Sequence, residues 1–113
     1  MGLVICKFKD TEDLEFLVYD KKEFNPEDFG MEKVRDTTLE ESSDVAIINL
    51  NEFLLRNIYP KQRTDTHILG ELGLETFDQI KAEKGLIDKK KSKLSKSQRD
   101  VVVRRYNDLI SLT

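Results

Sequence analysis

The chain has 113 residues, which is the size of one ordinary domain and too short for two independent hydrophobic cores. Its apolar fraction of 38% is low and its charged fraction of 36% is high, which predicts a small core beneath a strongly charged surface. Branched and aromatic runs at 45–50 and 53–58 argue against a wholly disordered chain, and no stretch approaches the roughly 20 apolar residues of a membrane-spanning helix.

The net charge of −3 conceals two oppositely charged segments. Residues 1–44 carry a charge of −7 and residues 81–105 carry +7. We therefore expect one domain, 1–113, with an acidic, sheet-containing half over 1–59 and a basic, helical half over 60–113. The sequence leaves open whether folding brings the two segments together to neutralise each other or keeps them apart.

Cys6 is the only cysteine and lies within an apolar run, so it is predicted to be a core residue rather than a nucleophile. A single cysteine excludes an intramolecular disulfide, which fits a reducing compartment. The first ten residues lack the apolar core of a secretory signal. We expect a soluble, cytoplasmic protein that does not bind membranes.

The first predicted elements are two strands, because residues 3–9 and 14–19 both alternate with a period of two. The polar residues 10–13 form a connection of the length that joins antiparallel neighbours, which predicts a β-hairpin. An isolated hairpin is marginal in water, so it must pack on the helices that follow, and it can recruit a third strand.

Asn25 and Pro26 have the properties of a helix cap and a first helical residue, and two acids follow them. We expect a short helix here, weakened at Gly30, with Met31 and Val34 among its few apolar residues. The polar residues 37–44 are predicted to be a loop or a single helical turn.

Residues 45–59 fit two interpretations. One helix would place Ile47, Leu50 and Ile58 on a single stripe. Alternatively, 45–50 is a strand and Asn51 caps a helix that ends before Pro60. The β-branched run favours the second interpretation, which also supplies the third strand.

Three helices are predicted after Pro60. The first starts at Asp65 or Thr66 and ends at Gly73, and the second covers 74–84 and ends at Gly85. The third starts at a Ser95 capping box and is amphipathic. Its apolar side consists of Val102, Tyr106, Leu109 and Ile110, whereas the second helix buries Phe77 and Ile80 and the hairpin buries Phe16.

The predicted fold class is therefore α+β. An N-terminal antiparallel β-hairpin, extended to three strands if 45–50 joins it, packs on several short helices and a longer C-terminal amphipathic helix.

The sequence contains no recognisable catalytic or cofactor motif. His67 and Glu71 share a helical face with Asp65 nearby, which is a conceivable metal site, but a lone His beside acids is usually exposed or a capping residue. We expect no enzyme activity, cofactor or metal.

The basic segment is the main functional signal, because Lys and Arg beside phosphates gain affinity by releasing condensed counterions. It predicts a regulatory protein that binds nucleic acid or another polyanion. The same cations could instead form a solvated surface or an internal partner for the acidic half. The candidate nucleic-acid-binding residues are Lys89, Lys90, Lys91, Lys93, Lys96, Arg99, Arg104 and Arg105.

The alternative is a protein–protein interaction module or inhibitor. It would use the acidic half as a mimic of nucleic-acid charge, or an apolar helix face as the seam of a homodimer. The Lys-, Ile- and Asn-rich composition resembles that of small accessory proteins of low-GC bacteria, their phages and mobile elements.

Overall fold

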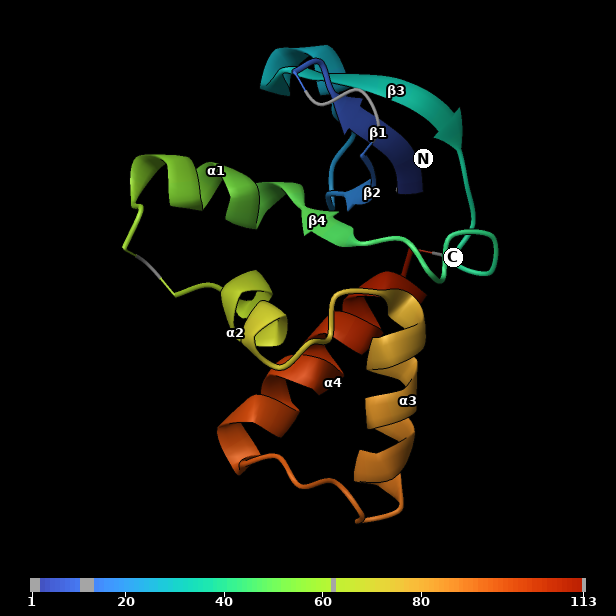
Figure 1. Cartoon of the computed structure of the whole chain (residues 1–113), viewed down its shortest axis with the longest axis vertical. Coiled ribbons are helices and arrows are strands. Elements are labelled where there is room, and N and C mark those ends of the chain that lie inside the picture. The colour runs from blue at the N-terminus through green and yellow to red at the C-terminus, as the bar shows by residue number, and fades with distance from the viewer. Residues whose placement is uncertain (1–2, 11–13, 62, 113) are drawn as a thin grey trace.

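The computed structural model describes residues 3–10, 14–61 and 63–112 and confirms the predicted α+β class. Four strands form one mixed sheet in the order β3-β1-β2-β4, with the helices α2, α3 and α4 gathered below it in Figure 1. The strands are β1 (Leu3–Phe8), β2 (Glu15–Tyr19), β3 (Met31–Asp36) and β4 (Ile47–Asn49). The helices are the 3-10 helix η1 (Pro26–Phe29), α1 (Leu50–Ile58), α2 (Asp65–Glu71), α3 (Phe77–Asp88) and α4 (Lys96–Ile110).

The predicted hairpin is confirmed: β1 and β2 pair in antiparallel register, with Leu3 opposite Tyr19 and Lys7 opposite Glu15. Residues 11–13 of its predicted connection lie outside the described residues. Both central strands are almost continuously apolar because each face of the sheet is covered. The alternation of side chains divides them between two clusters.

The larger cluster lies between the sheet and α2, α3 and α4. The second cluster lies on the opposite face, where Cys6 and Val18 pack with Met31 and with Leu50 at the start of α1. Partly buried phenylalanines line this second face, so it is less completely covered than the first. The fully buried members of the larger cluster include Ile5, Leu17, Tyr19, Ile80, Val102 and Leu109.

Burial of Val102 agrees with its predicted position, whereas Phe16 is only half-buried on the second face. Cys6 is a buried core residue as predicted, and its burial raises the thiol pKa to about 11. A thiol with this pKa stays protonated at neutral pH, so Cys6 lacks the thiolate that nucleophilic chemistry needs.

The helix predicted from Asn25 is limited to the single turn η1, and the expectation that it continues to Val34 is wrong. Asn25 does cap it, since its side chain accepts a hydrogen bond from the Glu27 amide at 3.2 Å. Gly30 then adopts a left-handed conformation with φ of 73°, which ends the helix. Residues Met31–Asp36 form β3, which pairs antiparallel with β1 and supplies partners for backbone groups that would otherwise be exposed at a sheet edge.

The strand-then-helix interpretation of 45–59 is confirmed. β4 pairs with β2 in parallel, placing Tyr19 opposite Asn49, and α1 follows at once. The cap is Asn49 rather than Asn51, because the Asn49 side chain accepts a hydrogen bond from the Glu52 amide at 2.9 Å. The strand predicted as the third therefore lies at one edge of a four-stranded sheet, with β3 at the other edge.

Capping boxes start the last two helices, at Thr76 with Gln79 and at the predicted Ser95 with Gln98. The predicted end of the second helix at Gly85 is wrong, because α3 continues through Gly85 to Asp88. On α4 the buried stripe is also rotated from the predicted one. Its buried residues are Val101, Val102, Arg105 and Leu109, whereas Ile110 is 41% exposed.

Candidate nucleic-acid interface

The four lysines of the α3–α4 connection, Lys89, Lys90, Lys91 and Lys93, are all exposed. In Figure 1 this connection lies at the opposite end of the long axis from the sheet, and the long axis measures 42 Å. None of the four lysines has an ion-pair partner among the described residues. We call this connection, with its four unpaired lysines, the basic loop.

The backbone of the basic loop is fixed by the way α3 ends. The Lys91 amide donates to the Leu86 carbonyl at 2.8 Å and the Lys90 amide donates to the Ile87 carbonyl at 3.0 Å, which is the pattern of a Schellman motif. Lys90 holds the left-handed position with φ of 57°, where glycine is the usual residue. A lysine at this position retains a charged side chain at the expense of backbone strain.

We therefore expect Lys90→Gly to stabilise the free protein by about 1 kcal/mol, because glycine removes the contact between Cβ and the backbone that disfavours this conformation. Thermal or urea unfolding measures the change. The matched control is Lys89→Gly, because Lys89 has φ of −88° and glycine there only adds flexibility to the unfolded chain. An unchanged or lower stability for Lys90→Gly, relative to the parent protein, would contradict the strain.

The carboxylates nearest to the basic loop in sequence are already engaged. Glu83 accepts a hydrogen bond from the Ser92 hydroxyl at 2.6 Å, and Asp88 pairs with Lys84 at 2.9 Å. Asp100 pairs with Lys96 at 3.3 Å. The positive charge of the four lysines is therefore not cancelled by a direct contact.

The other predicted site residues divide into two groups. Lys96 is exposed near the loop at the start of α4, and Arg99, one turn later, is half-buried. Arg104 is committed elsewhere, since its Nε and Nη2 atoms each lie 2.9 Å from a carboxylate oxygen of Asp65. Arg105 is only 3% exposed, so it does not belong to the surface to which the sequence pattern assigned it.

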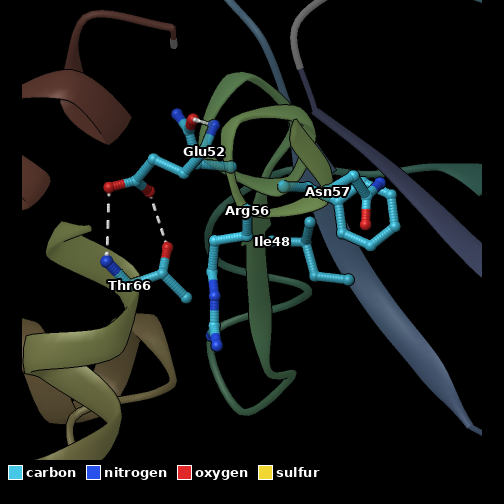
Figure 2. Close-up of a pocket in the computed structure, with 7 residues that line it drawn as sticks. Ile48, Glu52, Arg56, Asn57 and Thr66 are labelled. Atoms are coloured by element: carbon cyan, nitrogen blue, oxygen red, sulfur yellow. Dashed lines mark hydrogen bonds between the residues drawn. The ribbon is translucent and has the colours of Figure 1, made fainter. Parts of the chain in front are cut away.

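Arg105, on α4, instead forms hydrogen bonds with residues of α1 and α2. Its Nη2 atom donates to Glu52 on α1 at 2.5 Å and to the Thr66 hydroxyl on α2 at 3.1 Å. Figure 2 shows Glu52 reaching from α1 towards Thr66, whose hydroxyl and backbone amide donate to the two carboxylate oxygens at 2.6 and 3.2 Å. A cavity of about 330 Å³ lies beside this network, between α1 and α2. Sequence analysis missed the network, although an arginine in the same stripe as Val101, Val102 and Leu109 was a signal for it.

The acidic and basic segments do not neutralise each other by direct contact. Within residues 3–10 and 14–44, Glu32 pairs with Lys7 and Glu15 pairs with Arg35, both on neighbouring strands. No ion pair among the described residues joins the segment 1–44 to the segment 81–105. The acidic segment therefore leaves the four lysines of the basic loop without a carboxylate partner among the described residues.

His67 lies 3.4 Å from Glu71, but each neighbouring carboxylate has another partner. Arg63 binds Glu71 at 2.6 Å and lowers the pKa of that carboxyl, and Asp65 is held by Arg104. In the part of the chain that the structure describes, no group of three or more His, Cys, Asp or Glu side chains is placed to hold a metal ion.

Comparisons with protein-family models, with curated proteins and with solved structures found no match. Within the described residues no helix is both long enough and apolar enough to cross a bilayer. Function must therefore be inferred from the site itself.

Proposed function

We propose that this is a small, non-enzymatic regulatory protein that binds the phosphate backbone of nucleic acid through the basic loop. The observation that carries the proposal is the group of four exposed, unpaired lysines, one of which occupies a strained backbone position. Glycine is the usual residue at such a left-handed position, so backbone conformation does not explain the lysine at 90, which supports a role for its side chain.

The acidic segment 1–44 does not prevent such binding, because no ion pair among the described residues joins it to the basic loop. The Debye length is about 8 Å at physiological ionic strength, so charges farther than this from a ligand at the loop are largely screened. Contacts from lysine ammonium groups to phosphates position a protein on nucleic acid without reading its sequence. We therefore expect weak discrimination between sequences.

The direct test is a fluorescence anisotropy titration of the parent protein with short mixed-sequence DNA and RNA duplexes. Four phosphate contacts predict that log affinity falls with log salt with a slope of about −3.6 for DNA. Affinity should then fall by about 10²-fold between roughly 50 and 200 mM salt. Absence of binding at the lower salt concentration, or affinity that does not depend on salt, would overturn the proposal.

A protein–protein interaction is the second candidate, and the exposed end of α1 favours it. Ile58 is 66% exposed and Tyr59 is 58% exposed, with Leu54 one turn earlier on the same helix. Two copies of this apolar face would form a homodimer seam. Sedimentation of the parent protein measures this association, and a dimer that does not bind nucleic acid would favour the second candidate. Both candidates assume a soluble, cytoplasmic protein, such as a phage or mobile-element accessory protein.

A further inference from the structure

The cavity of about 330 Å³ between α1 and α2 lies apart from the basic loop. Its lining comes from the end of β4, from one face of α1 and from Thr66 at the start of α2 (Figure 2). In Figure 1, α1 lies beside the sheet, whereas the basic loop lies at the opposite end of the molecule. Small-molecule sites in proteins have volumes of roughly 300 to 1,000 Å³, so this cavity is large enough for a small ligand.

The cavity uses a different face of α1 from the proposed homodimer seam. Phe53, Arg56 and Asn57 line it, and their spacing of three and four residues places them on one side of the helix. Leu54 and Ile58 are turned to the opposite side, because a helix has 3.6 residues per turn. A ligand in the cavity and a second copy on the seam are therefore separate possibilities with separate tests.

The floor of the cavity is apolar and accessible. Ile48 and Phe53 line it and are only half-buried. A neighbouring cavity of about 260 Å³ shares Ile48 and Thr66 with the first and is also lined by Phe16 and Leu74. The two cavities therefore adjoin over Ile48. An aliphatic chain that covered this floor would remove half-buried apolar surface from water, which is favourable.

The charge of the lining favours an anion. Glu52 is the one carboxylate among the lining residues, and it is already compensated, because it binds the Arg105 guanidinium and accepts two hydrogen bonds from Thr66. Arg56 is exposed and forms neither a hydrogen bond nor an ion pair among the described residues. In Figure 2 the Arg56 side chain extends from α1 on the side of Thr66, with no hydrogen bond drawn to its guanidinium. The uncompensated charge of the cavity is thus positive.

We propose that this cavity binds a small monocarboxylate with an aliphatic chain. The planar guanidinium of Arg56 donates two parallel hydrogen bonds to the carboxylate, and the chain lies over Ile48 and Phe53. The other end of the chain is uncharged, because the neighbouring cavity is apolar and has the exposed Glu75 at its lining. This binding is additional to the proposed contact between the basic loop and nucleic acid.

The test is a titration of the ¹⁵N-labelled protein followed by nuclear magnetic resonance. Sodium butanoate, hexanoate and octanoate are added separately, with sodium chloride as the control at equal ionic strength. We expect saturable shifts of the amides of 48–49, 52–57 and 66, with little change at 89–93. Affinity should rise about threefold for each added methylene that is buried. Hexanamide, which has the same chain without the charge, should bind at least about tenfold more weakly than hexanoate.

The diagnostic variant is Arg56→Gln, which removes the cation from an exposed position and leaves the apolar floor intact. We expect the affinity for hexanoate to fall about tenfold and the affinity for hexanamide to stay the same. Arg56→Lys should restore only part of the loss, because an ammonium group lacks the planar pair of donors. Lys61→Gln is the matched control, since Lys61 is an exposed cation that does not line the cavity.

Four outcomes would overturn the proposal. The first is the absence of saturable shifts at 48–49, 52–57 and 66 with all three carboxylates, including the case in which shifts are confined to 89–93. The second is equal affinity for hexanoate and hexanamide, and the third is an equal loss of hexanoate affinity in Arg56→Gln and Lys61→Gln. The fourth is unchanged hexanoate affinity in Arg56→Gln, which would show that Arg56 serves only the carbonyl end of α1, where a cation is also favourable.

Discussion

Replacing Glu52 with Ala is expected to lower the free energy of unfolding by about 3 to 5 kcal/mol, because it leaves the buried Arg105 cation without its carboxylate. The cost arises from desolvation: Arg105 is 3% exposed and cannot recover its hydration without opening the contact between α1, α2 and α4. Thr66 loses its acceptor at the same time. Urea unfolding followed by circular dichroism measures the change.

Asp65→Ala is the matched control, because Asp65 pairs with Arg104, the residue next to Arg105 on the same helix. That pair is more exposed, with 58% of the Arg104 side chain accessible, so its loss should lower stability by at most about 1 kcal/mol. The double replacement Glu52→Leu with Arg105→Leu should cost less than the sum of its single replacements, because neither charge is then left buried alone. Equal losses for Glu52→Ala and Asp65→Ala would show that the Glu52–Arg105 pair is not desolvated.

Changing the four lysines of the basic loop to Gln is expected to flatten the dependence of log affinity on log salt by about 0.9 per lost phosphate contact, or about 3 to 4 in total for duplex DNA. Affinity should fall alike for every duplex sequence, because phosphate contacts carry no base information. Fluorescence anisotropy at several salt concentrations measures both effects. Folding stability should change by no more than about 0.5 kcal/mol, since the four side chains are exposed and unpaired.

The matched control changes four other exposed lysines to Gln, namely Lys21, Lys22, Lys61 and Lys81. It lowers the net charge by the same amount without altering the loop. An equal loss of affinity in the two variants would show that total charge, rather than the loop, drives binding. If the loop lysines instead offset the acidic segment, the loop variant would lose stability, and added salt would reduce that loss.

The elements that were predicted correctly are those whose signals are local. β1 and β2 alternate because side chains of each strand enter both clusters, and Ser95 with Gln98 identifies the start of α4 within four residues of sequence. The capping box of Thr76 and Gln79 gives the same kind of signal for the start of α3, whereas the predicted helix began at residue 74.

β3 could not have been found in this way. It is an edge strand in which only Met31 is buried, so the alternation that reveals a half-buried strand is missing. Pairing with β1, rather than burial, determines its conformation. The local signal at Asn25 and Pro26 was correct, but it indicated one turn and not a longer helix.

The candidate sites show the same division between local and distant information. Exposed lysines in a connection follow from composition, so the basic loop was predictable. The partner of Arg105 is Glu52, 53 positions away in the sequence, and no local pattern selects that carboxylate from 22 acidic residues.

The edge strand β3 also affects how copies of this protein associate. Four of its six residues are charged, namely Glu32, Lys33, Arg35 and Asp36, and all of these except the half-buried Glu32 are exposed. Charged side chains of both signs along an open edge discourage a second sheet from adding to it, which protects the protein from aggregation by strand pairing. Self-association by strand addition is therefore disfavoured at β3, which leaves the other edge of the sheet, at β4, and the helix surfaces.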